Sequence, residues 1–210
     1  MGKNIFVIIF LFCLKSFCFS QTSYQFDYNL KLRSNQSAQK NIDFTYIINS
    51  KEPLYGMYLY DDAKGAIFDN KENIRRNFNY RIKAKEIMIH QFLKETSFVS
   101  YDEIKIEHII VEKIKENKYS IKCYPEKDNK NSNLELMVYL KPFNEDVIRF
   151  YYLDLSNHIQ TRIIDSLKEK LNGNYNYVVE RYTVDYKNGA ISTNSLKKID
   201  KINFRIEPPK

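Results

Sequence analysis

Tryptophan is absent from this chain of 210 residues, and glycine and proline occur only five times each. With so few glycines, the chain contains no glycine-rich loop that would cradle a phosphate. It also lacks the G-x-S-x-G pattern that presents a nucleophilic serine in many hydrolases. The absence of tryptophan removes the largest aromatic platform for stacking on a sugar ring. A hydrolase therefore stays open only as an alternative without a recognisable motif.

Histidine is scarce as well, and the three histidines lie far apart in the sequence. They form neither an H-x-H nor an H-E-x-x-H spacing. The one with acids beside it occurs in Glu107-His108, and neighbouring residues of a strand point to opposite faces. Because a metal site needs several ligands that converge, we expect no metal site and no cofactor. The histidines are His90, His108 and His158.

Only three cysteines occur, and Cys13 and Cys18 lie within the first twenty residues. Once those residues are removed, Cys123 is alone and no intramolecular disulfide can form. The alternating residues around Cys123 indicate a strand with a small buried thiol. A reactive thiol or an intermolecular bridge is the alternative. Lys15 and Phe17 precede Cys18, and they do not resemble the acylation site of a bacterial lipoprotein.

The first twenty residues have the parts of a secretory signal peptide. Lys3 gives a positive start, Ile5–Leu14 is an apolar run, and Cys18-Phe-Ser20 has small side chains at its first and third places. The run is too short to span a bilayer, since a membrane helix needs about 20 apolar residues. We predict a signal peptide at 1–20, a mature chain from Gln21 without a transmembrane span, and a periplasmic or extracellular location.

Positive charge is in excess but is not concentrated. Lysine and arginine number 33 against 26 aspartates and glutamates, which gives a net charge of +7. Both signs are interspersed, as in Lys113–Lys118, so no basic stripe for nucleic acid exists and no nucleic-acid partner is expected. A net charge distributed in this way is explained most simply by its contribution to solubility. Attraction to an anionic lipid or polysaccharide is a further consequence left open.

Strand-forming residues dominate, with 17 tyrosines and 14 phenylalanines. Tyr24–Arg33 alternates strictly between apolar and polar residues, which predicts a half-buried strand. The polar stretch Ser34–Gln39 predicts a turn. Short strands joined by such turns are typical of an antiparallel meander. Further strands are predicted at Ile42–Ile48, Leu54–Tyr60, Ala66–Phe68, Asn77–Lys83, Leu134–Leu140, Val147–Leu155, Tyr175–Tyr186 and Lys198–Ile206, with a loop at Glu126–Asn133.

Two segments fit either a helix or a strand. Ala84–Leu93 has no decisive period. In Glu103–Ile114 the isoleucines suit one face of a helix, but they also suit a strand. The run of β-branched residues there, followed by a polar turn at Lys115–Lys118, favours a β-hairpin.

One helix is clearly predicted, near 157–171, where an apolar side chain recurs at every fourth position. Ser156 or Asn157 is suited to cap its start, and Asn172-Gly173 to end it. Such a stripe must pack on another element, and a curved sheet is what the rest of the chain offers. The stripe consists of Ile159, Ile163, Leu167 and Leu171, widened by Ile164.

Paired carboxylates occur at Asp61-Asp62 and Glu145-Asp146. Glycoside hydrolysis needs two carboxyl groups that face one sugar. Both pairs lie in turn-like stretches, where an aspartate is expected to bond to the local backbone. We therefore interpret both as structural, and no catalytic residue is assigned.

Four stretches form a recognisable pattern: Phe44–Ser50 with the tyrosine-rich segment after it, Asn172-Gly173, Val179–Tyr186 and Leu196–Ile206. With the glutamine after the cleavage site, this pattern resembles uncharacterised secreted proteins of Bacteroidota. The resemblance contains no catalytic motif and implies compartment and fold. The order of strands, helix and strands is also similar to the half-barrel of periplasmic lipoprotein carriers. That similarity implies a concave sheet face that holds acyl chains, and fold alone does not fix function.

These patterns predict one α+β domain at 21–210, with a large curved antiparallel β-sheet (an open half-barrel) and one main packed helix. We expect a non-enzymatic envelope protein that binds an apolar ligand, such as a lipid, or another envelope component on the sheet. A structural or protein-interaction module without a ligand is the alternative. The aromatic residues expected on a binding face are Tyr24, Phe26, Tyr28, Phe44, Tyr46, Tyr58 and Tyr60.

Overall fold

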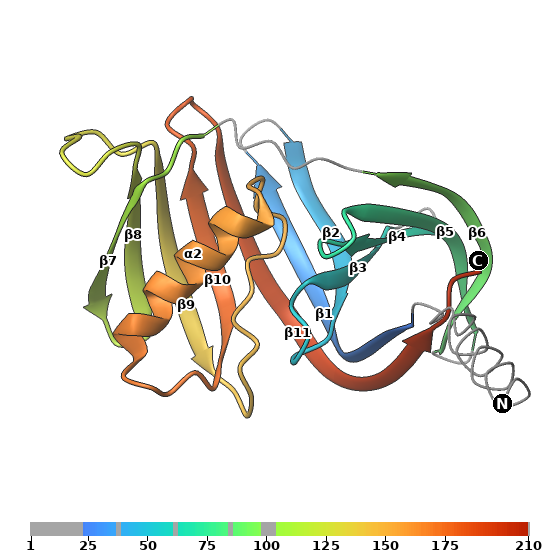
Figure 1. Ribbon diagram of the computed structural model, residues 1–210. Coiled ribbons are helices and arrows are strands. Elements are labelled where there is room, and N and C mark those ends of the chain that lie inside the picture. The colour runs from blue at the N-terminus through green and yellow to red at the C-terminus, as the bar shows by residue number, and fades with distance from the viewer. Residues whose placement is uncertain (1–22, 37–38, 61–62, 84–85, 98–103, 210) are drawn as a thin grey trace, which may run out of the picture.

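The computed structural model describes residues 23–36, 39–60, 63–83, 86–97 and 104–209, so the predicted signal peptide lies outside the described residues. Within them, eleven strands form one antiparallel sheet in the order β6-β5-β4-β3-β2-β1-β11-β10-β9-β8-β7 (Figure 1). The strands are β1 (Tyr24–Gln36), β2 (Gln39–Ile48), β3 (Tyr55–Leu59), β4 (Lys64–Asp69), β5 (Ile74–Lys83), β6 (Glu86–Ser97), β7 (His108–Lys115), β8 (Lys118–Tyr124), β9 (Leu134–Pro142), β10 (Tyr177–Asp185) and β11 (Ile191–Ile206).

The first and last strands lie side by side in the middle of the sheet. β1 pairs with β11 from Tyr24 opposite Ile206 to Gln36 opposite Ser192. From β1 the chain runs outward through consecutive hairpins to β6, and from β7 it runs inward to β11. β6 and β7 are the two edges, so the sheet is open. The predicted fold, a large open antiparallel sheet with a packed helix, is confirmed.

The predicted helix is present as α2 (Asn157–Lys168), with a 3-10 turn at Glu169–Leu171. Ser156 caps it, because its hydroxyl accepts a hydrogen bond of 3.3 Å from the backbone N–H of Ile159. Asn172, with a left-handed φ of 51°, ends it. Figure 1 shows α2 lying across one face of the sheet on its β7–β10 side. All four residues of the predicted stripe are buried: Ile159, Ile163, Leu167 and Leu171.

Apolar side chains form a core on each face of the sheet, over different sets of strands. One cluster, the helix-side core, joins the sheet to α2 and includes Leu30, Leu32, Val138, Tyr182 and Leu167. Ile48 belongs to it, while the adjacent Ile47 of β2 faces the opposite way. This opposite cluster, the strand-side core, consists of Tyr24, Phe26, Ile47, Met57, Leu59, Ile67, Phe78, Tyr80 and Ile206.

β1 contributes to both cores, although its apolar residues alternate regularly. Tyr24 and Phe26 lie in the strand-side core, whereas Tyr28 lies in the helix-side core. Between Phe26 and Tyr28 the register with β11 shifts, and an extra residue of β11 is accommodated. A bulge of this kind bends and twists a strand. Figure 1 shows β1 and β11 bending together at this end of the sheet.

The predicted strand at Val147–Leu155 is wrong. The segment makes one isolated parallel bridge, between Val147 and Val178, and otherwise runs irregularly. Its apolar residues are buried consecutively rather than alternately, because the segment packs within the helix-side core. Tyr152 has a φ of 64°, which a strand does not tolerate. In this segment, aromatic and β-branched residues indicate burial in the core, and they do not indicate a strand.

Several strand boundaries also differ from the prediction, and two of the differences bear on the centre of the sheet. Ser34–Gln39 is not a turn throughout, since β1 continues to Gln36 and β2 begins at Gln39. The last strand begins at Ile191 instead of Lys198, and it pairs with the end of β1. Of the two ambiguous segments, the described part of the first is a strand from Glu86 (β6), and the second is a strand from His108 (β7). The predicted hairpin of β7 with β8 is confirmed. Among the described helices, none has the length and apolar character to cross a membrane.

Candidate functional site

The aromatic residues expected on a binding face mostly fill the protein's own cores. Tyr24, Phe26, Tyr28 and Phe44 are buried, and Tyr46 and Tyr58 pack against the helix-side core. Tyr60 is partly exposed. The structure therefore brings these residues to two opposite faces and does not assemble them into one site.

Three of the tyrosines form a stack on the helix-side face of β2 and β3. The ring centroids of Tyr46 and Tyr58 are 4.4 Å apart, and those of Tyr58 and Tyr60 are 6.5 Å apart with nearly parallel planes. Gly56 makes room for the stack, because a Cβ on it would come within 2.3 Å of the Tyr46 hydroxyl. Burial raises the pKa of Tyr46 to about 12, and burial also raises the pKa of Tyr58 well above its ordinary value.

A second aromatic group has a structural role in the strand-side core. The Tyr24 hydroxyl donates a hydrogen bond of 2.7 Å to the Asp69 carboxylate and accepts one from Arg76. Arg76 also pairs with Glu95 on β6 at 2.9 Å. Burial, followed by the hydrogen bond to Asp69, raises the pKa of Tyr24 above its ordinary value. This chain of contacts ties β1 to β4, β5 and β6.

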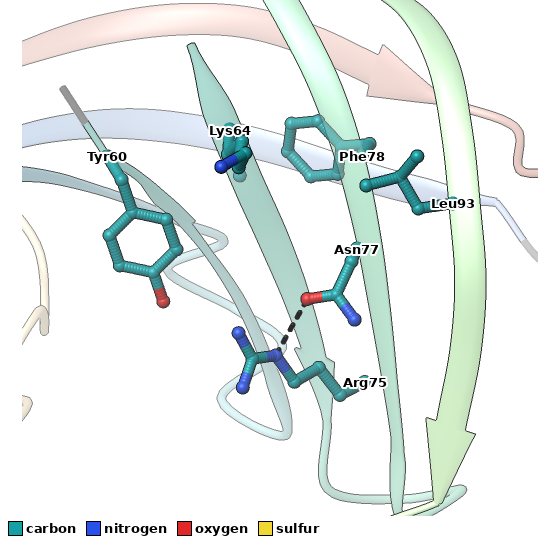
Figure 2. Close-up of a pocket in the computed structure, with 7 residues that line it drawn as sticks. Tyr60, Lys64, Arg75, Asn77, Phe78 and Leu93 are labelled. Carbon is teal, nitrogen blue, oxygen red and sulfur yellow. Dashed lines mark hydrogen bonds between the residues drawn. The ribbon is translucent and has the colours of Figure 1, made fainter. Parts of the chain in front are cut away.

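A hollow of about 310 Å³ lies at the end of the tyrosine stack. Figure 2 shows the side chains that surround it, with Arg75 and Asn77 reaching from β5 and Leu93 from the edge strand β6. Phe78 packs over Gly65, where a Cβ would come within 2.3 Å of the ring. The lining residues are Tyr60, Lys64, Gly65, Arg75, Asn77, Phe78 and Leu93.

The polar side of the hollow is cationic. Arg75 donates a hydrogen bond of 2.9 Å from Nε to the Asn77 side-chain oxygen, and its guanidinium lies 5.2 Å from the centre of the Phe68 ring. Among the described residues no carboxylate lies within 4 Å of Arg75. With Phe78 and Leu93 opposite, the hollow offers an apolar wall beside a fixed positive charge. That combination suits a ligand that has an apolar part and an anionic group.

Sequence reasoning found Tyr60 but missed the rest of the hollow. The alternation of Arg75, Asn77 and Asn79 against Phe78 and Tyr80 was the available signal, since it marks a polar face next to an apolar one. This alternation does not indicate where a hollow forms between the polar face of this strand and its neighbours.

Within the described ranges, the carboxylates of the predicted pair Glu145-Asp146 bond to different partners. Glu145, in the segment between β9 and α2, accepts hydrogen bonds from Tyr28 of β1 at 2.9 Å and from Ser50 at 3.2 Å. These bonds join that segment to β1. The pair Asp61-Asp62 lies outside the described residues. No three of the histidine, cysteine, aspartate or glutamate side chains in the described ranges lie close enough to hold a metal ion. His90 lies on the exposed edge strand β6 and His158 on the exposed start of α2.

Comparisons with known proteins place few limits on the function. No protein family and no curated protein matches the sequence. Among solved structures, the fold is similar to a LolA superfamily protein from Nitrosomonas europaea, with 8% sequence identity over 89% of each chain and a TM-score of 0.29. A TM-score this low carries no argument about function.

Proposed function

We propose that this chain is an exported, non-enzymatic binding protein of the cell envelope that takes an amphiphilic ligand, with an apolar part and an anionic group, into the hollow between β4, β5 and β6. The observation that supports this proposal is the hollow itself, with Arg75 on one side and Phe78 and Leu93 on the other. Its volume of about 310 Å³ is at the lower end of the range for small-molecule sites. A single short acyl chain is therefore a better match than a large lipid.

Ligand uptake is tested with a fluorescent fatty acid and a matched pair of variants. Leu93 and Met88 lie on the same strand and are 40% and 39% exposed, but only Leu93 lines the hollow. Leu93→Asp is expected to weaken binding at least tenfold, because it places a negative charge beside the acyl chain, while Met88→Asp leaves binding unchanged. Equal effects of the two substitutions, or no uptake by the wild-type protein, would reject the proposal.

Native mass spectrometry of the protein purified from its host's envelope then identifies the ligand. A co-purifying amphiphile that is lost in Leu93→Asp supports the proposal. A bare chain that also fails to take up the fatty acid supports the second candidate, a structural or interaction module. The observation that favours this second candidate is that the expected binding aromatics are mostly used as core.

Export is the other part of the proposal, and it rests on the sequence of residues 1–20. The expected mature protein begins at Gln21 and has no covalently attached lipid. N-terminal sequencing and intact mass of the exported protein measure this directly. A mature protein that retains Met1–Ser20, or that is acylated on Cys18, contradicts it.

A further inference from the structure

The sheet face opposite α2 carries a line of polar residues that crosses five strands. Lys118, Tyr139 and Arg181 are direct cross-strand neighbours on β8, β9 and β10. Each is adjacent in sequence to a residue of the helix-side core (Tyr119, Val138 and Tyr182), so the three point to the other face. The line continues through Ser195 to Arg33.

Two cations in this line share one aromatic ring. The Arg181 guanidinium lies 4.2 Å from the centre of the Tyr139 ring, and the Lys118 ammonium lies 5.2 Å from it. No carboxylate lies within 4 Å of either cation among the described residues. Two positive charges thus lie at one aromatic ring, and no carboxylate of the described residues neutralises either of them.

Some other cations on the same face are paired with carboxylates. Arg33 forms a two-pronged contact with the Asp43 carboxylate at 2.6 and 2.7 Å. Lys187 pairs with Glu135 at 2.9 Å and with Asp185 at 3.0 Å. The face is therefore not uniformly basic. Among the described residues, Lys31 and Lys122 also lie on it without a carboxylate within 4 Å, but Lys118 and Arg181 are the two that lie over one aromatic ring.

The surroundings add neutral hydroxyl groups. Thr183 lies two residues along β10 from Arg181, and its hydroxyl is 2.9 Å from that of Thr193. Ser120 lies two residues along β8 from Lys118. The Lys118 ammonium, with a further contribution from Arg181, lowers the pKa of the Tyr139 phenol below its ordinary value. The phenol is in consequence a stronger hydrogen-bond donor than an isolated tyrosine.

We propose that Lys118, Tyr139 and Arg181 form a binding site for a phosphate group, separate from the hollow described above. The guanidinium fork, the ammonium and the phenolic O–H are three separate donor groups, which suit a phosphate, with its greater charge and larger number of acceptor oxygens, better than a carboxylate. The bound group supplies the counter-charge that the protein lacks here. The phosphate comes either from a soluble phosphate ester or from the headgroup of an anionic phospholipid.

The test follows the Tyr139 phenol by NMR in protein with ¹³C-labelled tyrosine, with the resonance assigned from Tyr139→Phe. Inorganic phosphate is the first probe, and chloride and acetate at equal ionic strength are the controls. Phosphate is expected to shift the Tyr139 signal saturably and to raise the phenol pKa towards its ordinary value. Chloride and acetate are expected to give only the small linear shift of screening.

Matched variants separate a site from general charge. Arg181→Gln and Lys118→Gln are each expected to weaken phosphate binding about tenfold or more, whereas Arg33→Gln, on the same line but already paired with Asp43, leaves it unchanged. An equal loss in Arg33→Gln, an equal response to acetate, or no saturable shift overturns the proposal.

The source of the phosphate is distinguished with vesicles. Binding of glycerol phosphate but not of phosphatidylglycerol vesicles assigns the site to a soluble ester. Binding to phosphatidylglycerol vesicles, lost in Arg181→Gln and absent with phosphatidylcholine alone, assigns it to a lipid headgroup. Neither assay involves Leu93, so failure here leaves the amphiphile proposal intact, and the reverse also holds.

Discussion

Tyr182 and Tyr151 hold each other in place through the backbone. The Tyr182 hydroxyl donates a hydrogen bond of 2.5 Å to the Tyr151 carbonyl oxygen, and the Tyr151 hydroxyl donates one of 2.6 Å to the Val179 carbonyl oxygen. Both side chains are fully buried, with ring centroids 5.9 Å apart. The irregular segment before α2 is thereby fastened to β10.

The first prediction removes one of these hydroxyls. Tyr182→Phe keeps the ring but leaves a buried carbonyl without its donor, so the free energy of unfolding is expected to fall by about 1–3 kcal/mol. Tyr151→Phe is expected to act similarly. Urea unfolding measures the loss, and Tyr175→Phe, at a residue that is 40% exposed, is the control. Unchanged stability in both buried variants would show that these hydrogen bonds are not formed in solution.

The second prediction tests the docking of α2. Leu167 is fully buried, while Asp165 on the same helix is exposed. Leu167→Ala is expected to cost about 2–5 kcal/mol through lost burial and a cavity, and Leu167→Asp to unfold or insolubilise the protein. Asp165→Ala should change little. A melting temperature unaffected by Leu167→Asp would mean that the helix is not docked on the sheet.

The third prediction concerns the close approach of Gly56 and Tyr46. A Cβ at position 56 would meet the Tyr46 ring and hydroxyl at 2.3 to 2.6 Å, so Gly56→Ala is expected to destabilise by about 1–3 kcal/mol through overpacking. The cost should largely disappear when Gly56→Ala is made in a Tyr46→Ala background. A double-mutant cycle by thermal unfolding measures this coupling. Additive effects would contradict the packing of the ring over the glycine.

Much of the fold was predictable because local patterns determine it. The four-residue spacing from Ile159 to Leu171 predicted α2 together with its end at Asn172-Gly173. Strict alternation predicted β1. Each of these elements is buried on one side only. Its apolar residues therefore recur at the period of the helix or strand, and the sequence shows that period.

The remainder depends on contacts between distant segments. In Val147–Leu155, consecutive apolar side chains are buried in the core. The segment therefore has the apolar and aromatic composition of a strand without forming one. The pairing of β1 with β11, and the bulge that sends Tyr24 and Tyr28 to different cores, involve residues far apart in sequence. The hollow was missed for the same reason, because it depends on how Gly65, Arg75 and Leu93 of three strands come together.

The fourth prediction concerns alkaline unfolding. Burial raises the pKa of Tyr46 from its ordinary 10.0 to about 12. Below pH 10 the phenol is protonated in both states and the stability is at its full value. Between about pH 10 and 12 the unfolded chain releases this proton while the folded protein keeps it, so the free energy of unfolding falls by about 1.4 kcal/mol per pH unit for this group.

Tyr46→Phe removes that titration and is expected to make the fall in stability between pH 10 and 12 shallower. Denaturant midpoints measured at several pH values supply the slope. The exposed Tyr175→Phe should reproduce the wild-type slope. A Tyr46→Phe slope equal to that of the wild type would show that the Tyr46 phenol titrates normally in the folded protein.

The fifth prediction is that Cys123 is protected from thiol reagents by the fold. The side chain is fully buried between Ile109 of β7 and Leu134 of β9, and burial raises its pKa to about 12. Because the thiolate is the reactive form, both effects suppress reaction at pH 8. In the mature chain, Ellman's reagent is expected to react only at the rate of unfolding, and urea should accelerate it. Asn188→Cys in a Cys123→Ala background places a thiol in the exposed β10–β11 turn and should react at once. Rapid reaction of native Cys123 would instead support the alternative of a reactive thiol, and it would show that β7 opens from the edge of the sheet.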